Sequence, residues 1–216
     1  MITPLKARTE ALVSQIDGAF RASMAAAFAH LRRSGLETGA KEVGDHAPHF
    51  ALPDPTGEMV SLGERLRAGP VVLSFFRGEW CPFCRVEMEA LLAAMPDLTA
   101  AGASLMMISP QDFSETLVAR SRDVPGLTVL KDPVNGVGLQ YGLVFRMPDV
   151  QREALLARGV DLSQVYGTDA WLLPIPATYV IRPDGTIALC HKDPDYTRRL
   201  DPTEIVASLR GPTAII

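Results

Sequence analysis

Cysteine is scarce in this sequence: Cys81, Cys84 and Cys190 are the three cysteines among 216 residues. A small secreted scaffold held by disulfide bonds carries many more in a shorter chain, so that class is excluded. Long apolar runs are missing too. No stretch reaches the roughly 18 apolar residues of a membrane span, and charges at Lys6 and Glu10 interrupt any secretory signal. We therefore expect a cytoplasmic protein with no membrane partner.

The chain also lacks an excess of positive charge. Lys and Arg number 21 against 25 Asp and Glu, which gives a formal net charge of -4. A nucleic-acid-binding protein normally has a basic face, so we expect no nucleic-acid partner. Hydrophobic residues make up 47% of the chain and charged residues 21%, as in ordinary soluble globular proteins. A domain of this size can bury a proper core without disulfide or metal cross-links.

The first 40 residues have the pattern of a helical extension. Between residues 4 and 34 apolar side chains recur with a four-residue spacing, and Gly35 and Gly39 end the pattern. This spacing predicts one helix whose apolar stripe packs against the protein or contacts a second copy. The stripe consists of Leu12, Ile16, Phe20, Met24 and Phe28. We divide the chain here into an extension, residues 1–40, and a domain, residues 41–216.

The domain alternates between strand and helix patterns. Residues 44–54, before a turn at 55–57, are typical of an edge strand or hairpin. Continuous apolar runs such as 71–76 are typical of buried parallel strands. Strands are predicted at 71–76, 104–109, 127–130, 177–181 and 187–190, and helices at 82–95, 112–122, 135–141, 149–158 and 202–209. The alternation predicts an α/β fold with a central mixed sheet flanked by helices.

One segment has the residues for redox chemistry, Trp80-Cys81-Pro82-Phe83-Cys84 at the end of a predicted buried strand. Pro82 suits the first position of a helix, which makes Cys81 the N-cap and places Cys84 in the first turn. The helix dipole and unpaired N–H groups stabilise a thiolate there, and the thiolate is the reactive form. We expect Cys81 to be the more exposed nucleophile. A pair buried away from solvent would count against this role.

Metal binding is the rival interpretation of the cysteine pair. A zinc site needs four ligands, and the other Cys/His pair is Cys190-His191. Neighbouring residues of a strand point to opposite faces, so these two would not close one site, and a second C-x-x-C is missing. We expect Cys190 to be a small buried residue. We expect no metal and no organic cofactor, since the sulfurs themselves carry the electrons.

Several stretches, taken in order, resemble the peroxiredoxin-like branch of the alkyl hydroperoxide reductase and thiol-specific antioxidant (AhpC/TSA) family, within the thioredoxin superfamily. They span about residues 43–200, and their order and spacing are more specific than any single one. The stretches are 43–50, 77–84, 108–111, 131–142, 173–181 and 193–197. The resemblance implies a thioredoxin-like fold and reduction of hydroperoxides by a cysteine thiolate. It also implies recycling by a thioredoxin- or glutathione-type thiol donor, and a homodimer.

This sequence departs from the family pattern at the site. The position of the peroxidatic cysteine falls on Cys84, and the Thr, Pro and Arg positions fall on Cys81, Arg77 and Pro176. The resemblance therefore favours Cys84 as the residue that attacks peroxide, whereas its place at the helix start favours Cys81. Both assignments stay open. In either one, the second cysteine closes a disulfide on the first.

Three further residues complete the candidate site. Arg77 could hold the thiolate and polarise the peroxide in place of the lost family arginine. Trp80 could position substrate, although packing against the core is the more usual role of such a residue. Pro176 resembles the cis-proline that faces the C-x-x-C of thioredoxins, where it would help to position substrate by leaving a neighbouring backbone group free to pair with it. Two neighbouring features are expected to be ordinary: Glu79 as a solvated turn carboxylate, and the Arg198-Arg199 pair at the surface.

Two other functions remain possible interpretations of the same motif. One is a thiol–disulfide oxidoreductase, in which Cys81 attacks a protein disulfide and Cys84 resolves the mixed disulfide. The other is a redox-sensing or scaffold protein without rapid turnover. Peroxide consumption by the reduced protein would favour a peroxidase over both of these functions.

Overall fold

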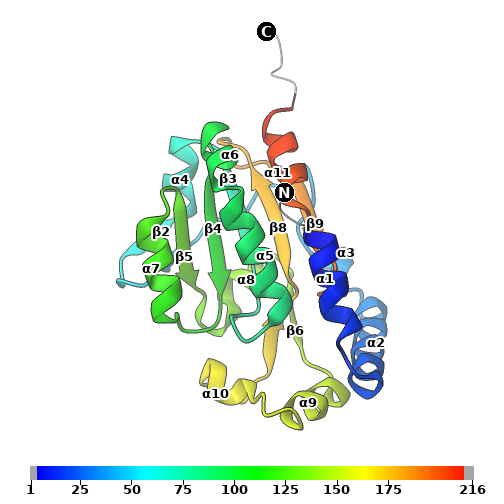
Figure 1. Cartoon of the computed structure of the whole chain (residues 1–216). Helices are drawn as coiled ribbons and strands as arrows, with labels where there is room; N and C mark the ends of the chain where they lie inside the picture. The colour runs from blue at the N-terminus through cyan, green and yellow to red at the C-terminus, as the bar shows by residue number, and fades with distance from the viewer. Residues whose placement is uncertain (1–3, 212–216) are drawn as a thin grey trace.

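The structure is a computed structural model that describes residues 4–211, and its centre is a five-stranded sheet (Figure 1). The strand order is β5-β4-β3-β8-β9, with β3, β4 and β5 parallel and β8 and β9 antiparallel to their neighbours. The strands are β3 Val71–Phe75, β4 Ser104–Ser109, β5 Leu127–Lys131, β8 Ala177–Ile181 and β9 Ile187–Lys192. The prediction of an α/β fold with a central mixed sheet is confirmed.

Both faces of the sheet are covered, which explains why β3 is apolar at nearly every position. Val72 packs on one side and Leu73 on the other, and every residue of β3 is buried. The helices that pack on the Val72 side are α5 Pro82–Ala93, α6 Met95–Ala100, α7 Glu115–Asp123 and α11 Pro202–Leu209. This face supports the start of α5, where the cysteine pair lies.

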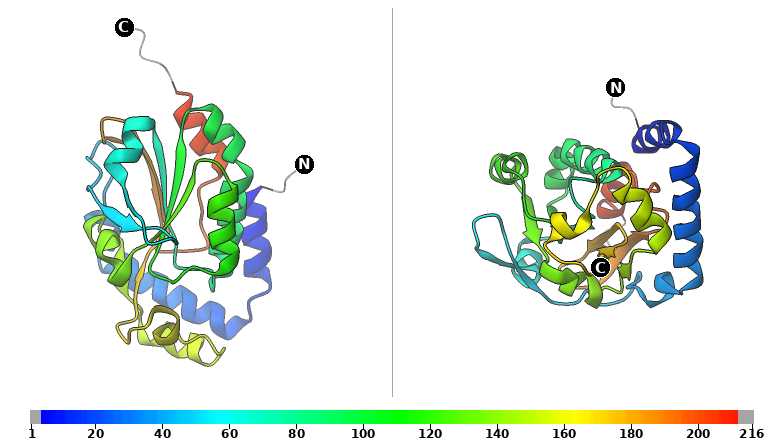
Figure 2. Two further views of the ribbon diagram at one scale, coloured as in Figure 1. Left: turned by 90° about the vertical axis from the view of Figure 1, so that its left-hand side faces the viewer. Right: turned by 90° about the horizontal axis from the view of Figure 1, so that it is seen from below.

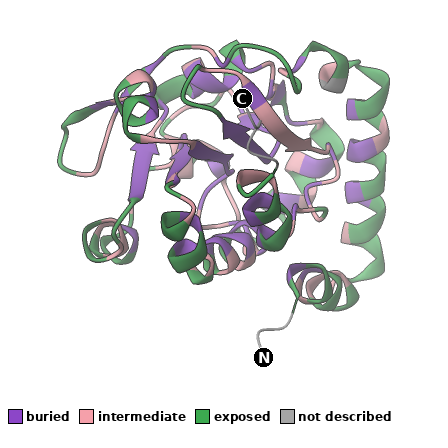
Figure 3. Ribbon diagram, turned by 90° about the horizontal axis from the view of Figure 1, so that it is seen from above, coloured by how far each residue is buried: buried purple, intermediate pink, exposed green. Residues whose placement is uncertain are grey.

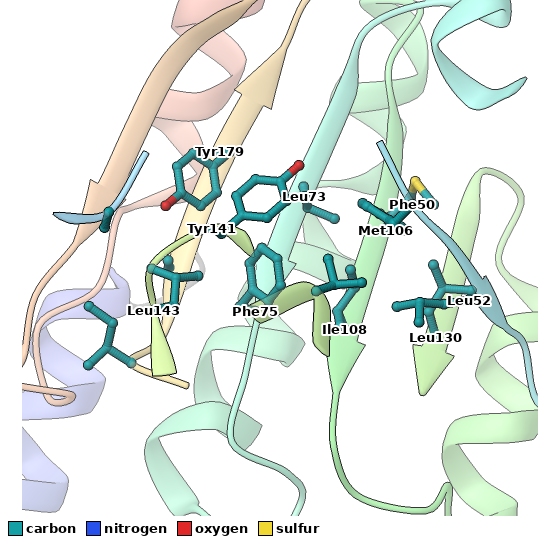
Figure 4. Packing of buried hydrophobic residues seen from close by; sticks show 14 of the residues in the cluster. Phe50, Leu52, Leu73, Phe75, Met106, Ile108, Leu130, Tyr141, Leu143 and Tyr179 are labelled. Atoms are coloured by element: carbon teal, nitrogen blue, oxygen red, sulfur yellow. The ribbon is translucent and has the colours of Figure 1, made fainter. Parts of the chain in front are cut away.

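The Leu73 side carries smaller elements. Its core includes Phe75, Tyr141 and Tyr179, whose rings pack together in Figure 4 with centroids 4.9 to 6.2 Å apart. The covering elements are α4 Leu62–Ala68, α8 Gly136–Gln140, the hairpin of β1 Ala51–Pro53 and β2 Met59–Ser61, and the two-stranded sheet of β6 Val144–Arg146 and β7 Leu172–Pro174. The hairpin fits the interpretation of residues 44–54 as an edge element.

The N-terminal extension is two long helices, so the prediction of one helix over residues 4–34 was wrong. Helix α1 covers Leu5–Ser14, α2 covers Gly18–Arg33, and the short α3 covers Leu36–Gly39. The break occurs because the Asp17 carboxylate accepts the backbone N–H of Phe20 and so caps a new helix. The four-residue apolar spacing continues across Asp17, so the periodicity alone does not reveal that one helix ends and another begins there.

The extension lies along one side of the domain (Figure 2). Helix α1 packs on α5, and α2 packs on α9, which covers Asp149–Leu156. The inner side of α2 is buried and its outer side is exposed (Figure 3), and Met24 and Phe28 belong to the core on the α5 side of the sheet. The apolar stripe therefore packs against the chain's own domain.

Element boundaries match the predictions closely in the regular part of the sheet. The observed limits of β4, β8 and α11 are those predicted, and α7 and α8 are shorter than predicted. The sequence patterns missed β6, β7 and α10, which covers Leu162–Tyr166. Within residues 4–211, no helix combines the length and apolar character needed to cross a bilayer.

Candidate active site

The cysteine pair lies after the carboxyl end of β3, on a turn that side chains fix in place. Gly78 has φ +135, and a Cβ there would clash with the side-chain oxygen of Gln111. This close approach permits the backbone N–H of Glu79 to donate to Gln111 Oε1 at 2.8 Å. The Glu79 carboxylate accepts from the N–H and hydroxyl of Ser114, the N-cap of α7. Glu79 thus ties the turn to α7, which corrects its prediction as a solvated carboxylate.

Helix α5 begins as the sequence predicts. Cys81 is the N-cap, with φ -88 and ψ 115, Pro82 is the first helical residue, and Cys84 lies in the first turn. The prediction that Cys81 is the more exposed sulfur was wrong, because Cys81 is 0% exposed and Cys84 is 1% exposed. Arg77 is stacked on the Tyr196 ring and lies over Trp80. Cys81 is buried in the same cluster as Tyr196, with Trp80 packed against it.

Arg77 gives this buried site its electrostatic character. Its Nη2 lies 3.0 Å from Cys81 Sγ, and the residue is 2% exposed. No ion pair between the side chains that the structure describes includes Arg77. A buried guanidinium without a counter-charge is costly, and ionised Cys81 supplies that charge. Burial alone would argue against a redox pair, whereas a cation held against the sulfur argues for one.

Arg199 provides a second buried cation, and the prediction that it lies at the surface was wrong. Its side chain is 1% exposed, its Nη2 lies 3.5 Å from Cys84 Sγ, and it forms an ion pair with Glu87. Its Nε donates to the backbone carbonyl of Tyr196 at 2.8 Å. Arg198, next along the chain, is exposed and pairs with surface aspartates, as predicted. The sequence signal that could have found Arg199 is its place just after residues 193–197, one of the stretches that resemble the family.

The two thiols differ in their tendency to ionise. Burial acts to raise the pKa of Cys81, but a hydrogen bond from the Cys84 thiol and the charges of Arg77 and Arg199 outweigh it, so this pKa falls well below that of an ordinary thiol. Burial raises the pKa of Cys84, and the hydrogen bond to Cys81 and its negative charge raise it further. These opposite pKa shifts favour ionisation of Cys81 over ionisation of Cys84.

Trp80 is fixed beside the pair by hydrogen bonds. Its Nε1 donates to the Tyr166 hydroxyl at 2.9 Å and to the Arg77 carbonyl at 3.2 Å, and the Tyr166 hydroxyl donates to the same carbonyl at 2.6 Å. Tyr166 ends α10, an element that the sequence patterns missed. The prediction that Trp80 positions substrate stays a prediction.

Pro176 lies between β7 and β8 and does not have the predicted conformation. Its neighbour Ala177 pairs with Phe75, so Pro176 lies near the carboxyl end of β3. No peptide bond among residues 4–211 is cis, so the prediction of a cis-proline was wrong. The chain passes from one strand directly into the next, with Ile175 still donating its N–H to Leu143, and this path needs no reversal at Pro176.

The third cysteine, Cys190, packs on the other side of the sheet from the cysteine pair. Cys190 and His191 are neighbours on β9, and Cys190 is half-buried against the core on the Leu73 side of the sheet. Within residues 4–211, no group of three His, Cys, Asp or Glu side chains is arranged to hold a metal ion.

Comparison with known proteins extends the resemblance seen in the sequence. The pattern of the AhpC/TSA family matches residues 43–190. A protein of Mycobacterium tuberculosis strain H37Rv that carries a peroxiredoxin name is 34% identical over 149 residues, which is 68% of this chain and 82% of the relative. Peroxiredoxin Bcp of Escherichia coli strain K12 is 29% identical over 102 residues, or 47% of this chain and 65% of the relative.

Solved structures share the fold. Peroxidoxin BcpB from Mycobacterium tuberculosis matches with a TM-score of 0.56 and 23% identity, over 80% of this chain and 99% of that one. A cysteine-to-serine mutant of peroxiredoxin 6 from Arenicola marina matches with a TM-score of 0.58 and 19% identity, over 79% of this chain and 72% of that one. The predicted thioredoxin-like fold is confirmed. The chain belongs to the AhpC/TSA family and is a peroxiredoxin-like protein of the thioredoxin superfamily.

Proposed function

We propose that the protein is a thiol-dependent peroxidase in which Cys81 attacks a hydroperoxide and Cys84 resolves the product. The observation that carries this assignment is the 3.0 Å contact between Arg77 Nη2 and Cys81 Sγ at the start of α5. A guanidinium at this distance favours the thiolate, the form that reacts with peroxide. The family position of the peroxidatic cysteine falls on Cys84. The proposed nucleophile, Cys81, lies three residues before that position.

The reaction divides into two balanced steps. The Cys81 thiolate attacks the terminal oxygen of R–O–O–H, the S–O bond forms, and the O–O bond breaks with its electron pair leaving on RO⁻, which takes up a proton to give the alcohol. The Cys84 thiol then condenses with the Cys81 sulfenic acid, which forms the disulfide and releases water. An external thiol donor of the thioredoxin or glutathione type returns the pair to its reduced state.

Arg199 acts on the second step in this scheme. Its guanidinium lies beside the Cys84 sulfur and is paired with the buried Glu87, whose pKa is raised by burial in spite of the nearby positive charge. The cation lowers the cost of ionising Cys84 when that sulfur attacks the sulfenic acid. Arg77 thus contacts the sulfur that attacks and Arg199 the sulfur that resolves, while both charges act on both sulfurs.

Burial of both sulfurs favours the peroxidase over the alternative of acting on protein disulfides. Cys81 must be reached through a local opening of the side chains that cover it, Trp80 and Tyr196 among them. A hydroperoxide needs a small opening, whereas a protein disulfide needs the sulfur at the surface. The peptide bond before Pro176 is trans, so the expected cis-proline no longer supports action on protein disulfides.

The remaining assignments complete the proposal. We place the protein in the cytoplasm, where thiols stay reduced, because three cysteines are too few for a disulfide framework. Trp80 and Pro176 stay predicted substrate-positioning residues. The division into a 1–40 extension and a 41–216 domain, and the homodimer, also stay predictions.

The test uses reduced protein, one equivalent of hydrogen peroxide and mass spectrometry of the peptides. We expect a disulfide between Cys81 and Cys84, a trapped sulfenic acid on Cys81 in the Cys84→Ser variant, and continued turnover with a thiol donor in the Cys190→Ser control. Fast oxygen addition to Cys84 in the Cys81→Ser variant would reverse the roles of the two cysteines. Failure of the wild type to consume any peroxide would remove the peroxidase assignment.

A further inference from the structure

A row of polar residues crosses the α5 side of the central sheet, which is otherwise largely apolar. Ser74 on β3 is paired with Thr178 on β8, and Thr178 is paired with His191 on β9. Directly paired residues of antiparallel strands point to the same face of a sheet, with Cβ atoms about 5 Å apart. Val72 and Val180, which are each two residues from a member of the row, belong to the core on the α5 side. The row therefore faces α5 as well.

One ring nitrogen of His191 is buried without a partner. Its Nε2 forms no hydrogen bond with any residue that the structure describes, and the same holds for the Oγ of Ser74 in this row. The His191 residue as a whole is partly exposed, because β9 is the last strand of the sheet. A buried polar atom without a partner costs free energy, so its presence indicates a functional use. His191 thus connects solvent at the sheet edge with a polar interior.

Ionisable groups lead from His191 to the cysteine pair. Arg199 forms an ion pair with Glu87, and the same guanidinium lies 3.5 Å from the Cys84 sulfur. Burial raises the pKa of Glu87, whereas the charges of Arg199 and His191 act to lower it, which places His191 within electrostatic reach of this carboxyl. The charged and titratable groups around His191 are Glu87 and Cys84 on α5, Arg199 before α11, Lys192 and Asp193 beside it in the chain, and Arg32 of α2, which pairs with Asp193.

The proposed reaction needs a proton at this buried place. One thiolate, one thiol and one hydroperoxide give a disulfide, an alcohol and a hydroxide ion, so one proton must enter for the hydroxide to become water. Arg77 and Arg199 cannot supply it, because a guanidinium stays protonated in proteins. Cys81 and Cys84 are both buried, so a proton from solvent needs a path to them.

We propose that His191 and Glu87 form a relay that carries this proton from solvent to Cys84. The inference rests on the proposed function and adds the proton path of that site. As the O–O bond breaks, the alkoxide takes the proton of the Cys84 thiol. His191 then passes a proton through the Glu87 carboxylate to the Cys84 thiolate and regains one from solvent. Cys84 is again a thiol and condenses with the Cys81 sulfenic acid, which releases water, so one proton is consumed per disulfide.

Single-turnover kinetics test the relay. Reduced Cys190→Ser protein is mixed with one equivalent of hydrogen peroxide in weak buffer, and an indicator dye reports proton uptake while tryptophan fluorescence reports disulfide formation. Because an amide cannot transfer the proton, His191→Gln should slow both signals about tenfold, less than the roughly hundredfold effect of an acid that touches the reacting atoms. His30→Gln, which alters an exposed histidine of α2, is the matched control and should change neither. Unchanged rates in His191→Gln would overturn the relay.

Alkylation with iodoacetamide separates proton delivery from damage to the site, because a thiolate displaces iodide without taking up a proton. We expect Cys81 in His191→Gln to be alkylated at the rate of the unaltered site, as measured by mass spectrometry of its peptide, and His191→Asn to behave in the same way. Equal losses in alkylation and in the peroxide reaction would mean a structural role and overturn the inference, with the proposed function intact. Failure of the protein with His191 in place to consume peroxide would overturn both.

Discussion

The guanidinium of Arg77 lies 3.0 Å from the Cys81 sulfur in the interior of the protein, and no carboxylate that the structure describes forms an ion pair with it. Two residues four positions apart thus hold a cation and its anion at the end of β3. The first prediction follows from this contact. Arg77→Met should lower the rate constant for Cys81 oxidation at neutral pH by about a hundredfold, since transition-state donors of this kind contribute about that much.

The matched control for this variant is Arg85→Met, which removes an exposed arginine from helix α5. Stopped-flow measurement of sulfenic acid formation in a Cys84→Ser background compares the two. An undiminished rate in Arg77→Met would show that the guanidinium does not assist the attack.

The second prediction concerns pH. Because the pKa of Cys81 is lowered and that of Cys84 raised, the Cys190→Ser protein should carry one thiolate of the pair at neutral pH. The Cys81 thiolate is lost as pH falls through its lowered pKa, and the Cys84 thiolate forms only above the ordinary thiol value of about 8.5. Ultraviolet thiolate absorbance during titration measures both steps. A single step for both sulfurs near the ordinary value would contradict the charge arrangement at the site.

The third prediction compares neighbouring arginines. Arg199→Met leaves buried Glu87 without its partner and should lower the free energy of unfolding by about 3–5 kcal/mol, the usual cost of breaking a buried pair. Arg198→Met alters an exposed side chain and should change it by no more than about 0.5 kcal/mol. Urea denaturation measures both.

A double variant distinguishes loss of the Arg199–Glu87 ion pair from general damage to the core. Adding Glu87→Gln to Arg199→Met removes the unpaired charge and should recover part of the lost stability. If the double variant is less stable than Arg199→Met by the full cost of Glu87→Gln alone, the two residues are not coupled.

The fourth prediction concerns the support of Trp80. Tyr166→Phe removes the hydroxyl that joins Trp80 Nε1 to the Arg77 carbonyl, while Trp80 keeps that carbonyl as its second acceptor. The loss in stability should therefore be modest, about 1 kcal/mol. The rate of Cys81 oxidation should change together with the mobility of Trp80, which fluorescence anisotropy measures. Unchanged stability and anisotropy would mean that the hydroxyl does not fix the ring.

Local patterns were enough to predict the turn that carries the cysteine pair and much of the sheet. The apolar runs of β4 and β8 and the pattern of α11 are short-range signals, and these elements have the predicted limits. The start of α5 at Pro82 is also as predicted. The place of Arg77 at the end of a buried strand also brought it to the sulfur, as the sequence suggested.

The errors arise where distant contacts decide the outcome. Nothing local tells Arg199 from Arg198, since only the packing of the loop against α5 turns one of them inward. Strands β6 and β7 pair across a long intervening segment and have three residues each, too few for a periodic pattern. The exposure of Cys81 was misjudged for the same reason, because it is buried in a cluster that includes Tyr196, far along the chain.

The lack of a carboxylate beside Arg77 has a consequence for the whole cycle. In the proposed cycle, the anion opposite this guanidinium disappears when Cys81 and Cys84 form a disulfide, and the oxidised protein would hold an uncompensated charge in a medium of low polarity. That imbalance weakens the oxidised state relative to the reduced one and draws in an approaching negatively charged sulfur. The residue that starts the reaction by ionising one thiol therefore also helps a second molecule to end it.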